Sequence, residues 1–332
     1  MMNGNEVQQA LFQRVKAQLP EHLSLPEELA SLLGVSADSA YRRIRGEKMM
    51  DLNELVLVCS RFKISLDSLL AGSKNAYLFH GELVNEKNYS FRDWLLSITG
   101  QLQLMLQGPA PELIFQAKDL PVFHFFQIPE LAAFKYFFWQ KSFMQFSAYE
   151  KRKFSQDEAD PEIMALGRNV YLAYKSIPCS EIWTADIIHS TLRQISLYRQ
   201  SGVFRDEKEA SIIYDALLEL VGHLESEAES ACKFVYGEKA KLNDARYSLY
   251  INEVFIGDNA IYLTNGKKPF VYLNHTGINY IGTTDEQFCA HIENSFNHIM
   301  RKSTIISGVG EKERLRFFNL LRHEINTARA SS

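Results

Sequence analysis

The sequence of 332 residues has little of what an exported or membrane protein needs. Its four cysteines, Cys59, Cys179, Cys232 and Cys289, lie far apart and form no C-x-x-C pair, so neither a zinc site nor a disulfide framework is indicated. No run of about 18 apolar residues is present, which argues against a membrane-spanning helix. The N-terminal stretch is polar where a secretion signal has its apolar core. We therefore expect a cytoplasmic protein without a membrane partner.

The sequence also lacks the common catalytic and nucleotide-binding motifs. It contains no G-x-x-x-x-G-K-[ST], no G-x-G-x-x-G after a strand pattern, no G-x-S-x-G and no H-E-x-x-H. His291, Glu293 and His298 fall on one expected helix, but the two-residue spacing directs Glu293 away from His291. A solvated helix flank therefore explains them better than a metal site. We expect no enzymatic activity, no cofactor and no metal.

Composition and length favour a globular protein of about two domains. Hydrophobic residues make up 46% of the chain and charged residues 23%, as in ordinary folded proteins. At about 150 residues per domain, the chain has room for two. The net charge of −4 does not favour a nucleic-acid partner. Contacts with phosphate need only a local basic patch, however, so the positions of the basic residues matter more than their sum.

The first 75 residues have the pattern of a small all-helical domain. Residues 5–18 place apolar side chains at helical spacing. Residues 26–70 predict several short helices with very short connections, and Ser36 and Asp51 are placed as N-caps. The stretch 71–75, Ala-Gly-Ser-Lys-Asn, is the expected joint to the rest of the chain.

Within this domain, Pro26 to Arg45 has the spacing of a helix-turn-helix. Leu29 and Ala40 are expected to face the core, and Gly34 is expected to adopt a turn conformation that a Cβ would strain. Basic residues gather at the end of the second helix, at Arg42, Arg43, Arg45 and Lys48. The residues expected to point outward, as a set that enters a major groove does, are Ser36, Ala37, Asp38, Ser39, Tyr41, Arg42 and Arg45.

The string LASLLGVSADSAYRRIRGEK resembles the Cro/lambda-repressor-like (xenobiotic response element type) helix-turn-helix family, and DLNELVLVCSRFKISLDSLL resembles the two helices that follow in it. The resemblance covers about residues 5–70. It implies binding of double-stranded DNA with helix 36–45 in the major groove. Ser39 and Arg42 would then contact base edges, while Arg43, Arg45 or Lys48 would contact phosphate. Arg43 stands where the family usually has an apolar residue, which leaves open whether the helix end is rotated.

Residues 76–332 predict a larger, mainly helical α+β domain, so the fold class is α+β overall. An antiparallel β-meander is expected near 245–275, and a polar stretch at 150–162 marks a candidate sub-boundary. Thr283 and Glu286 form an expected capping box for the helix that follows the strands. The other expected helices cover about 90–106, 161–175, 184–200, 206–233 and 310–328.

Two features of this larger domain have alternative interpretations. The aromatic residues of 123–126 and 134–139 are either core or the lining of an effector pocket, and core is favoured. The apolar seams at 91–105 and 213–231 are either intramolecular contacts or dimer interfaces.

The sequence as a whole predicts a bacterial-type, sequence-specific transcriptional regulator. The second domain is expected to form a homodimer. Whether it also binds a small-molecule or protein effector is not specified by the sequence. Two alternatives stay open. The helical domain could serve a protein-interaction adaptor, or the larger domain could be an enzyme of unrecognised chemistry fused to an autoregulatory DNA-binding domain.

Overall fold

The computed structural model divides into two compact units, Met1–Leu78 and Phe79–Ser332. The expected joint at 71–75 lies outside the described residues. No helix in the described part of the chain is long and apolar enough to cross a membrane. The residues that the structure describes are 3–20, 22–66, 69, 77–81, 89–254 and 257–331.

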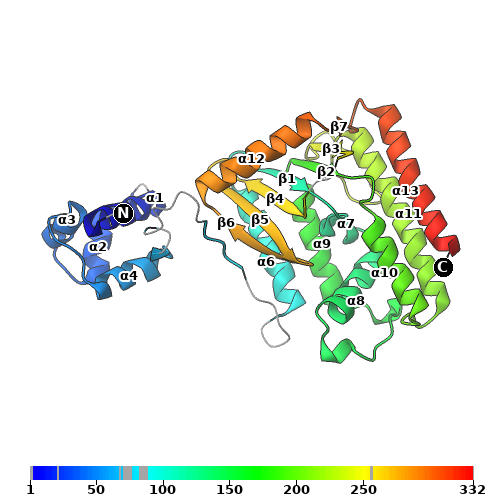
Figure 1. Cartoon of the computed structure of the whole chain (residues 1–332), viewed down its shortest axis with the longest axis horizontal. Helices are drawn as coiled ribbons and strands as arrows, with labels where there is room; N and C mark the ends of the chain where they lie inside the picture. Colours follow the sequence, from blue (N-terminus) through cyan, green and yellow to red (C-terminus); the bar gives the residue numbers. More distant parts are fainter. Residues whose placement is uncertain are drawn as a thin grey trace. The chain divides into compact units, whose positions relative to one another are not determined.

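The first unit is helical and has its own apolar core. The helices that the structure describes in it are α1 (Gly4–Gln18), α2 (Leu25–Leu33), α3 (Ala37–Ile44) and α4 (Leu52–Phe62) (Figure 1). The side chains that close the core come from all four helices and are Leu11, Phe12, Val15, Leu29, Ala40 and Val58. The amphipathic pattern at 5–18 therefore gave the correct helix, because the apolar positions of α1 meet those of three other helices.

Local signals position the helix ends in this unit. The Ser36 hydroxyl accepts a hydrogen bond from the Ser39 N–H at 3.3 Å, and Asp51 forms a reciprocal capping box with Glu54. Gly34 ends α2 in the left-handed region, with φ of +63°. Both predicted N-caps and the predicted turn glycine are confirmed.

The second unit is built on a seven-stranded mixed sheet of order β6-β5-β4-β1-β2-β3-β7. Strands β1, β2 and β3 are parallel, and all other neighbours are antiparallel. The α+β class is therefore confirmed. The strands are β1 (Glu112–Gln116), β2 (Cys179–Trp183), β3 (Tyr247–Ile251), β4 (Ala260–Thr264), β5 (Pro269–Thr276), β6 (Asn279–Thr283) and β7 (Thr304–Ile305).

Helices lie on both faces of the sheet (Figure 1). Successive side chains of a strand alternate between the two faces. In β1, Phe115 enters the larger core while Ile114 enters the smaller core beneath α12 (Glu286–Arg301). The helices of the larger side are α6 (Phe91–Leu106), α7 (Val122–Phe125), α8 (Pro129–Phe138), α9 (Pro161–Lys175), α10 (His189–Gln200), α11 (Glu207–Ser230) and α13 (Glu311–Ser331).

The strand region differs in detail from the prediction. The antiparallel meander is β4-β5-β6, and β3 is separated from it by β1 and β2, because β3 pairs in parallel with β2. Strand β2 was not predicted. Asp285, rather than Thr283, caps α12, by accepting a hydrogen bond from the Phe288 N–H at 2.9 Å. The stretch 150–162 lies inside the second unit, where Phe154 pairs with Phe204.

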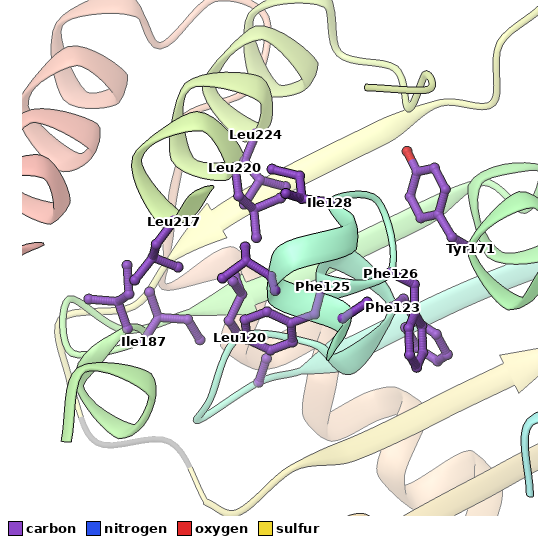
Figure 2. Packing of buried hydrophobic residues seen from close by; sticks show 14 of the residues in the cluster. Leu120, Phe123, Phe125, Phe126, Ile128, Tyr171, Ile187, Leu217, Leu220 and Leu224 are labelled. Carbon is purple, nitrogen blue, oxygen red and sulfur yellow. The ribbon is translucent and has the colours of Figure 1, made fainter. Parts of the chain in front are cut away.

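Both apolar seams pack within the chain. Leu95 on α6 and Leu217 on α11 are fully buried, and these helices pack against α9 and α13. Figure 2 shows Leu217, Leu220 and Leu224 along one face of α11, among the buried residues of the larger core. The aromatic stretches at 123–126 and 134–139 belong to the same core. Neither seam is therefore available as a dimer interface without unfolding the unit.

We expect Gly34→Val to destabilise the first unit by more than about 1 kcal/mol, because a β-branched residue is strained at positive φ. A Cβ at this position meets no atom within 4 Å, so the loss comes from the backbone and not from a collision. The measurement is thermal unfolding of residues 1–78 by circular dichroism. Gly34→Asn is the matched control and should lose less, since Asn tolerates the left-handed region. An unchanged melting temperature for Gly34→Val would contradict the assigned turn.

Candidate nucleic-acid interface

The turn between α2 and α3 fixes how the second helix leaves the first. The N–H groups of Gly34 and Val35 both donate to the Ala30 carbonyl, which closes the end of α2. Leu29 and Ala40 are fully buried where the two helices meet. This is the arrangement of a helix-turn-helix, in which the first helix supports the second.

The outer face of α3 carries most of the residues predicted to point outward. Ser39 is half-buried, and Tyr41 exposes 48% of its surface. The helix is eight residues long, so it presents about two turns to a partner. The predicted interface residues that are exposed are Ser36, Ala37, Asp38, Tyr41, Arg42, Arg45 and Lys48.

Arg43 does not belong to this face, and the prediction that it contacts phosphate is wrong. Only 3% of it is exposed. Its Nε and Nη2 donate to the two carboxylate oxygens of Glu54 at 2.9 and 2.5 Å, and its Nη1 donates to the Ser39 hydroxyl and carbonyl at 2.6 and 3.0 Å. Its hydrogen bonds to Glu54 raise the pKa of Arg43 and lower that of Glu54. Arg43 therefore fastens α3 to α4.

Gln8 is a second positioning residue, and the sequence analysis missed it. Its side-chain amide donates to the carbonyls of Arg43 at 2.8 Å and Lys48 at 2.9 Å, while its carbonyl accepts from the Met50 N–H at 2.8 Å. Gln8 is 3% exposed. Its buried side chain supplies hydrogen-bond partners to backbone groups at the end of α3 and in the segment after it. In the sequence, the feature that could have pointed to Gln8 is its place on the apolar face of α1, three residues before Leu11.

The charge of the exposed face is nearly balanced. Three cations, Arg42, Arg45 and Lys48, lie near two carboxylates, Asp38 and Glu47. The Glu47 carboxylate is 3.3 Å from Arg45 Nη1 and 3.8 Å from Arg42 Nε. Exposed pairs of this kind contribute about 0–1 kcal/mol and are easily exchanged for another anion. The local patch is basic, but only weakly so.

An exposed apolar strip runs along α4 in the same unit. Leu52 exposes 78% of its surface, Val56 62% and Leu57 47%. Leu52 and Val56 are four residues apart and therefore share one face of the helix. Apolar side chains exposed at this level on a small domain are suited to contact with another protein.

The second unit holds a buried polar cluster around Glu181 of β2. His124 Nε2 lies 2.9 and 3.1 Å from the two carboxylate oxygens, and the hydroxyls of Tyr174 and Tyr247 donate to them. Burial opposes ionisation of Glu181, but its interactions with His124 and Tyr174 outweigh it and lower its pKa. Glu181 and His124 are fully buried, so this cluster is inaccessible to a substrate and ties strands to helices.

A hollow of about 890 Å3 lies beyond the carboxyl ends of β2 and β3, the usual ligand position in open α/β sheets. Its charged lining is mixed, with Asp186 and Glu253 from the strand ends and Arg316 and His323 from α13. Lys118 at its edge is paired with Asp258 at 2.8 Å. No group of three or more metal-ligating side chains occurs within the described part of the chain.

Comparison with protein-family models, curated proteins and solved structures gives no match to this chain.

We expect the two neighbouring arginines of α3 to behave oppositely in unfolding measurements. Arg43→Ala leaves Glu54 without its buried partner and should destabilise residues 1–78 by about 3 kcal/mol. Arg42→Ala, on the exposed face, should change stability by less than about 0.5 kcal/mol. Urea unfolding of the two variants, followed by circular dichroism, makes the comparison.

The pH dependence of the stability of residues 1–78 provides an independent check of the Arg43–Glu54 pair. Because the pKa of Glu54 is lowered in the folded state, its contribution is complete above the unfolded value of about 4.3 and is lost as the pH falls below it. Glu54→Gln should remove that part of the acid sensitivity. Equal destabilisation by Arg43→Ala and Arg42→Ala would contradict the assigned burial of Arg43.

Proposed function

We propose that the chain is a sequence-specific DNA-binding regulator that places α3 in the major groove. The observation that carries this proposal is the helix-turn-helix of α2 and α3, with Gly34 in the left-handed region and Arg42 exposed on the outer face. An α-helix with a polar outer face fits the major groove, where arginine can contact guanine by two hydrogen bonds. Ser39 is half-buried and holds Arg43, so base contacts fall first to Tyr41 and Arg42.

The phosphate contacts in this proposal are made by Arg45 and Lys48. Both are exposed and lie just after the end of α3. At this end, a helix lying in the major groove meets the sugar-phosphate backbone of the duplex. Arg45 would exchange its exposed pairing with Glu47 for a phosphate.

The proposal includes a homodimer formed by the second unit. A single small domain buries limited surface on DNA and binds with modest affinity. Two linked domains make the second contact intramolecular, which raises the combined affinity without new contacts. The two seams are ruled out as the interface, so exposed residues of the second unit would form it.

A protein-interaction adaptor is the second candidate, and the apolar strip of Leu52, Val56 and Leu57 on α4 favours it. A partner helix or strand could cover this strip while α3 stays free. Substitution of Val56 by aspartate would impair such a partner and leave DNA binding intact, whereas Arg42→Ala would do the reverse.

The central experiment is selection of genomic DNA fragments by the purified chain, followed by fluorescence anisotropy with the selected duplex. Arg42→Ala should cost about 1–3 kcal/mol on this duplex and relax the preference at one base pair. Glu47→Gln removes the carboxylate beside Arg42 and Arg45 and should strengthen binding to selected and scrambled duplexes alike. Arg61→Ala, which removes an exposed arginine of α4, is the matched control. Equal affinity of the wild type for selected and scrambled DNA would refute the proposal.

Light scattering tests the dimer. The full chain at tens of micromolar should have about twice the monomer mass of 38.1 kDa. We expect a fragment of residues 79–332 to dimerise as well, and residues 1–78 to stay monomeric. Monomeric full-length protein, with and without DNA, would show that the second unit does not supply two-fold symmetry.

A further inference from the structure

A cavity of about 660 Å3 lies in the second unit, between α6 and one face of the sheet. Its volume falls in the range of about 300–1,000 Å3 typical of small-molecule sites. The wall from α6 includes Trp94, Ile98 and Leu102, and the opposite wall comes from β1, β4, β5, β6 and α7.

The antiparallel end of the sheet leaves this cavity open. In β5 and β6, Phe270, Tyr272 and Tyr280 face the cavity side but are only half-buried, unlike Phe115 in the centre of the sheet. A fully covered sheet face would bury these rings. Their partial exposure indicates an apolar surface that the described helices do not fill.

The lining specifies the chemistry of an occupant. Seven aromatic rings offer stacking surfaces: Tyr89, Trp94, Phe115, Phe123, Phe270, Tyr272 and Tyr280. The described lining has no lysine or arginine, and its one carboxylate, Asp93, is exposed and 3.6 Å from Arg92. An anion would lose its water here with no lysine or arginine of the described lining to pair with it. Ser97, Gln101 and Asn279 can hydrogen-bond a neutral polar group.

The cavity wall also contains the point at which the chain joins the sheet after the first unit. His80 and Gly282 exchange two backbone hydrogen bonds, each 2.7 Å, so that residues 79–81 lie along the edge strand β6. Phe79 packs edge-on against Phe288 at 5.1 Å. Gly81 lies so close to Ile281 that an added Cβ would be 2.7 Å from its Cγ2. Both His80 and Gly282 line the cavity.

We propose that this cavity binds an uncharged, largely apolar aromatic small molecule, and that its occupancy changes DNA affinity through residues 79–81. The binding site stands on the cavity alone, whereas the effect on DNA rests on the proposed function. An occupant that touches His80 and Gly282 would hold the chain segment against β6 and thereby restrict the path toward the first unit. A ligand acts in this way only if it binds the docked segment better than the released one.

Titration of the full chain with Nile red, a neutral aromatic dye, tests the site. Gln101→Trp places a large ring in the cavity lining, while Gln103→Trp makes the same change at an exposed position of α6 outside it. We expect saturable binding to the wild type, about tenfold weaker binding to Gln101→Trp, and unchanged binding to Gln103→Trp. Photolabelling with benzophenone, competed by Nile red, should modify peptides of α6 and of β5-β6.

Equal Nile red affinity of the two tryptophan variants, or benzophenone labels elsewhere, would overturn the site. The regulatory part is tested by anisotropy with the selected duplex. Saturating Nile red should shift the DNA affinity of the wild type and leave that of Gln101→Trp unchanged. Dye binding at the cavity with no shift in DNA affinity would overturn the coupling and retain the site. Failure to bind any DNA would refute the proposed function, while the dye and photolabelling results would still decide the site.

Discussion

The buried ion pair between Arg43 and Glu54 determines which face of α3 is presented. A guanidinium removed from water requires its counter-ion, and both carboxylate oxygens of Glu54 are used to supply it. Ala40 and Arg43 are three residues apart and share the inner face, so Tyr41, Arg42 and Arg45 lie outside. The helix-turn-helix family that the sequence resembles usually has an apolar residue at the position of Arg43. Arg43 keeps the inward direction of that residue and adds a charge neutralised from α4, so the helix end need not rotate.

Local patterns predicted the first unit well, because its helix ends depend on neighbours in sequence. Ser36, Asp51 and Gly34 act within three or four residues, which a pattern can detect. Arg43 and Gln8 depend on partners 11 to 42 residues away. An arginine beside other arginines is ordinarily solvated, so nothing local marks the one that is buried. The structure therefore exposes Arg42, Arg45 and Lys48, as the sequence analysis expected, and buries Arg43.

The second unit was predicted in class but not in topology, since its sheet is assembled from distant segments. Strand β2 escaped prediction because two of its five residues, Ser180 and Glu181, are polar. The carboxylate of Glu181 is satisfied by His124, Tyr174 and Tyr247 from other elements. The cavity beside α6 was predicted only in part. Phe123, from a stretch considered as a pocket lining, lies in its wall, but the other walls come from α6 and from strands that are distant in sequence.

The balance of charge on the outer face of α3 bears on how such a regulator would be controlled. Glu47 already pairs with Arg42 and Arg45, so exchanging it for phosphate would offset part of the electrostatic attraction in each domain. Affinity would then depend on shape-matched base contacts and on two domains engaging together. Control of DNA binding would be most effective where it acts on the joint engagement of the two domains. Residues 79–81, held to β6 by two hydrogen bonds, lie on the only covalent route between the two units. A change in their docking would therefore act on joint engagement without altering the contacts that α3 makes.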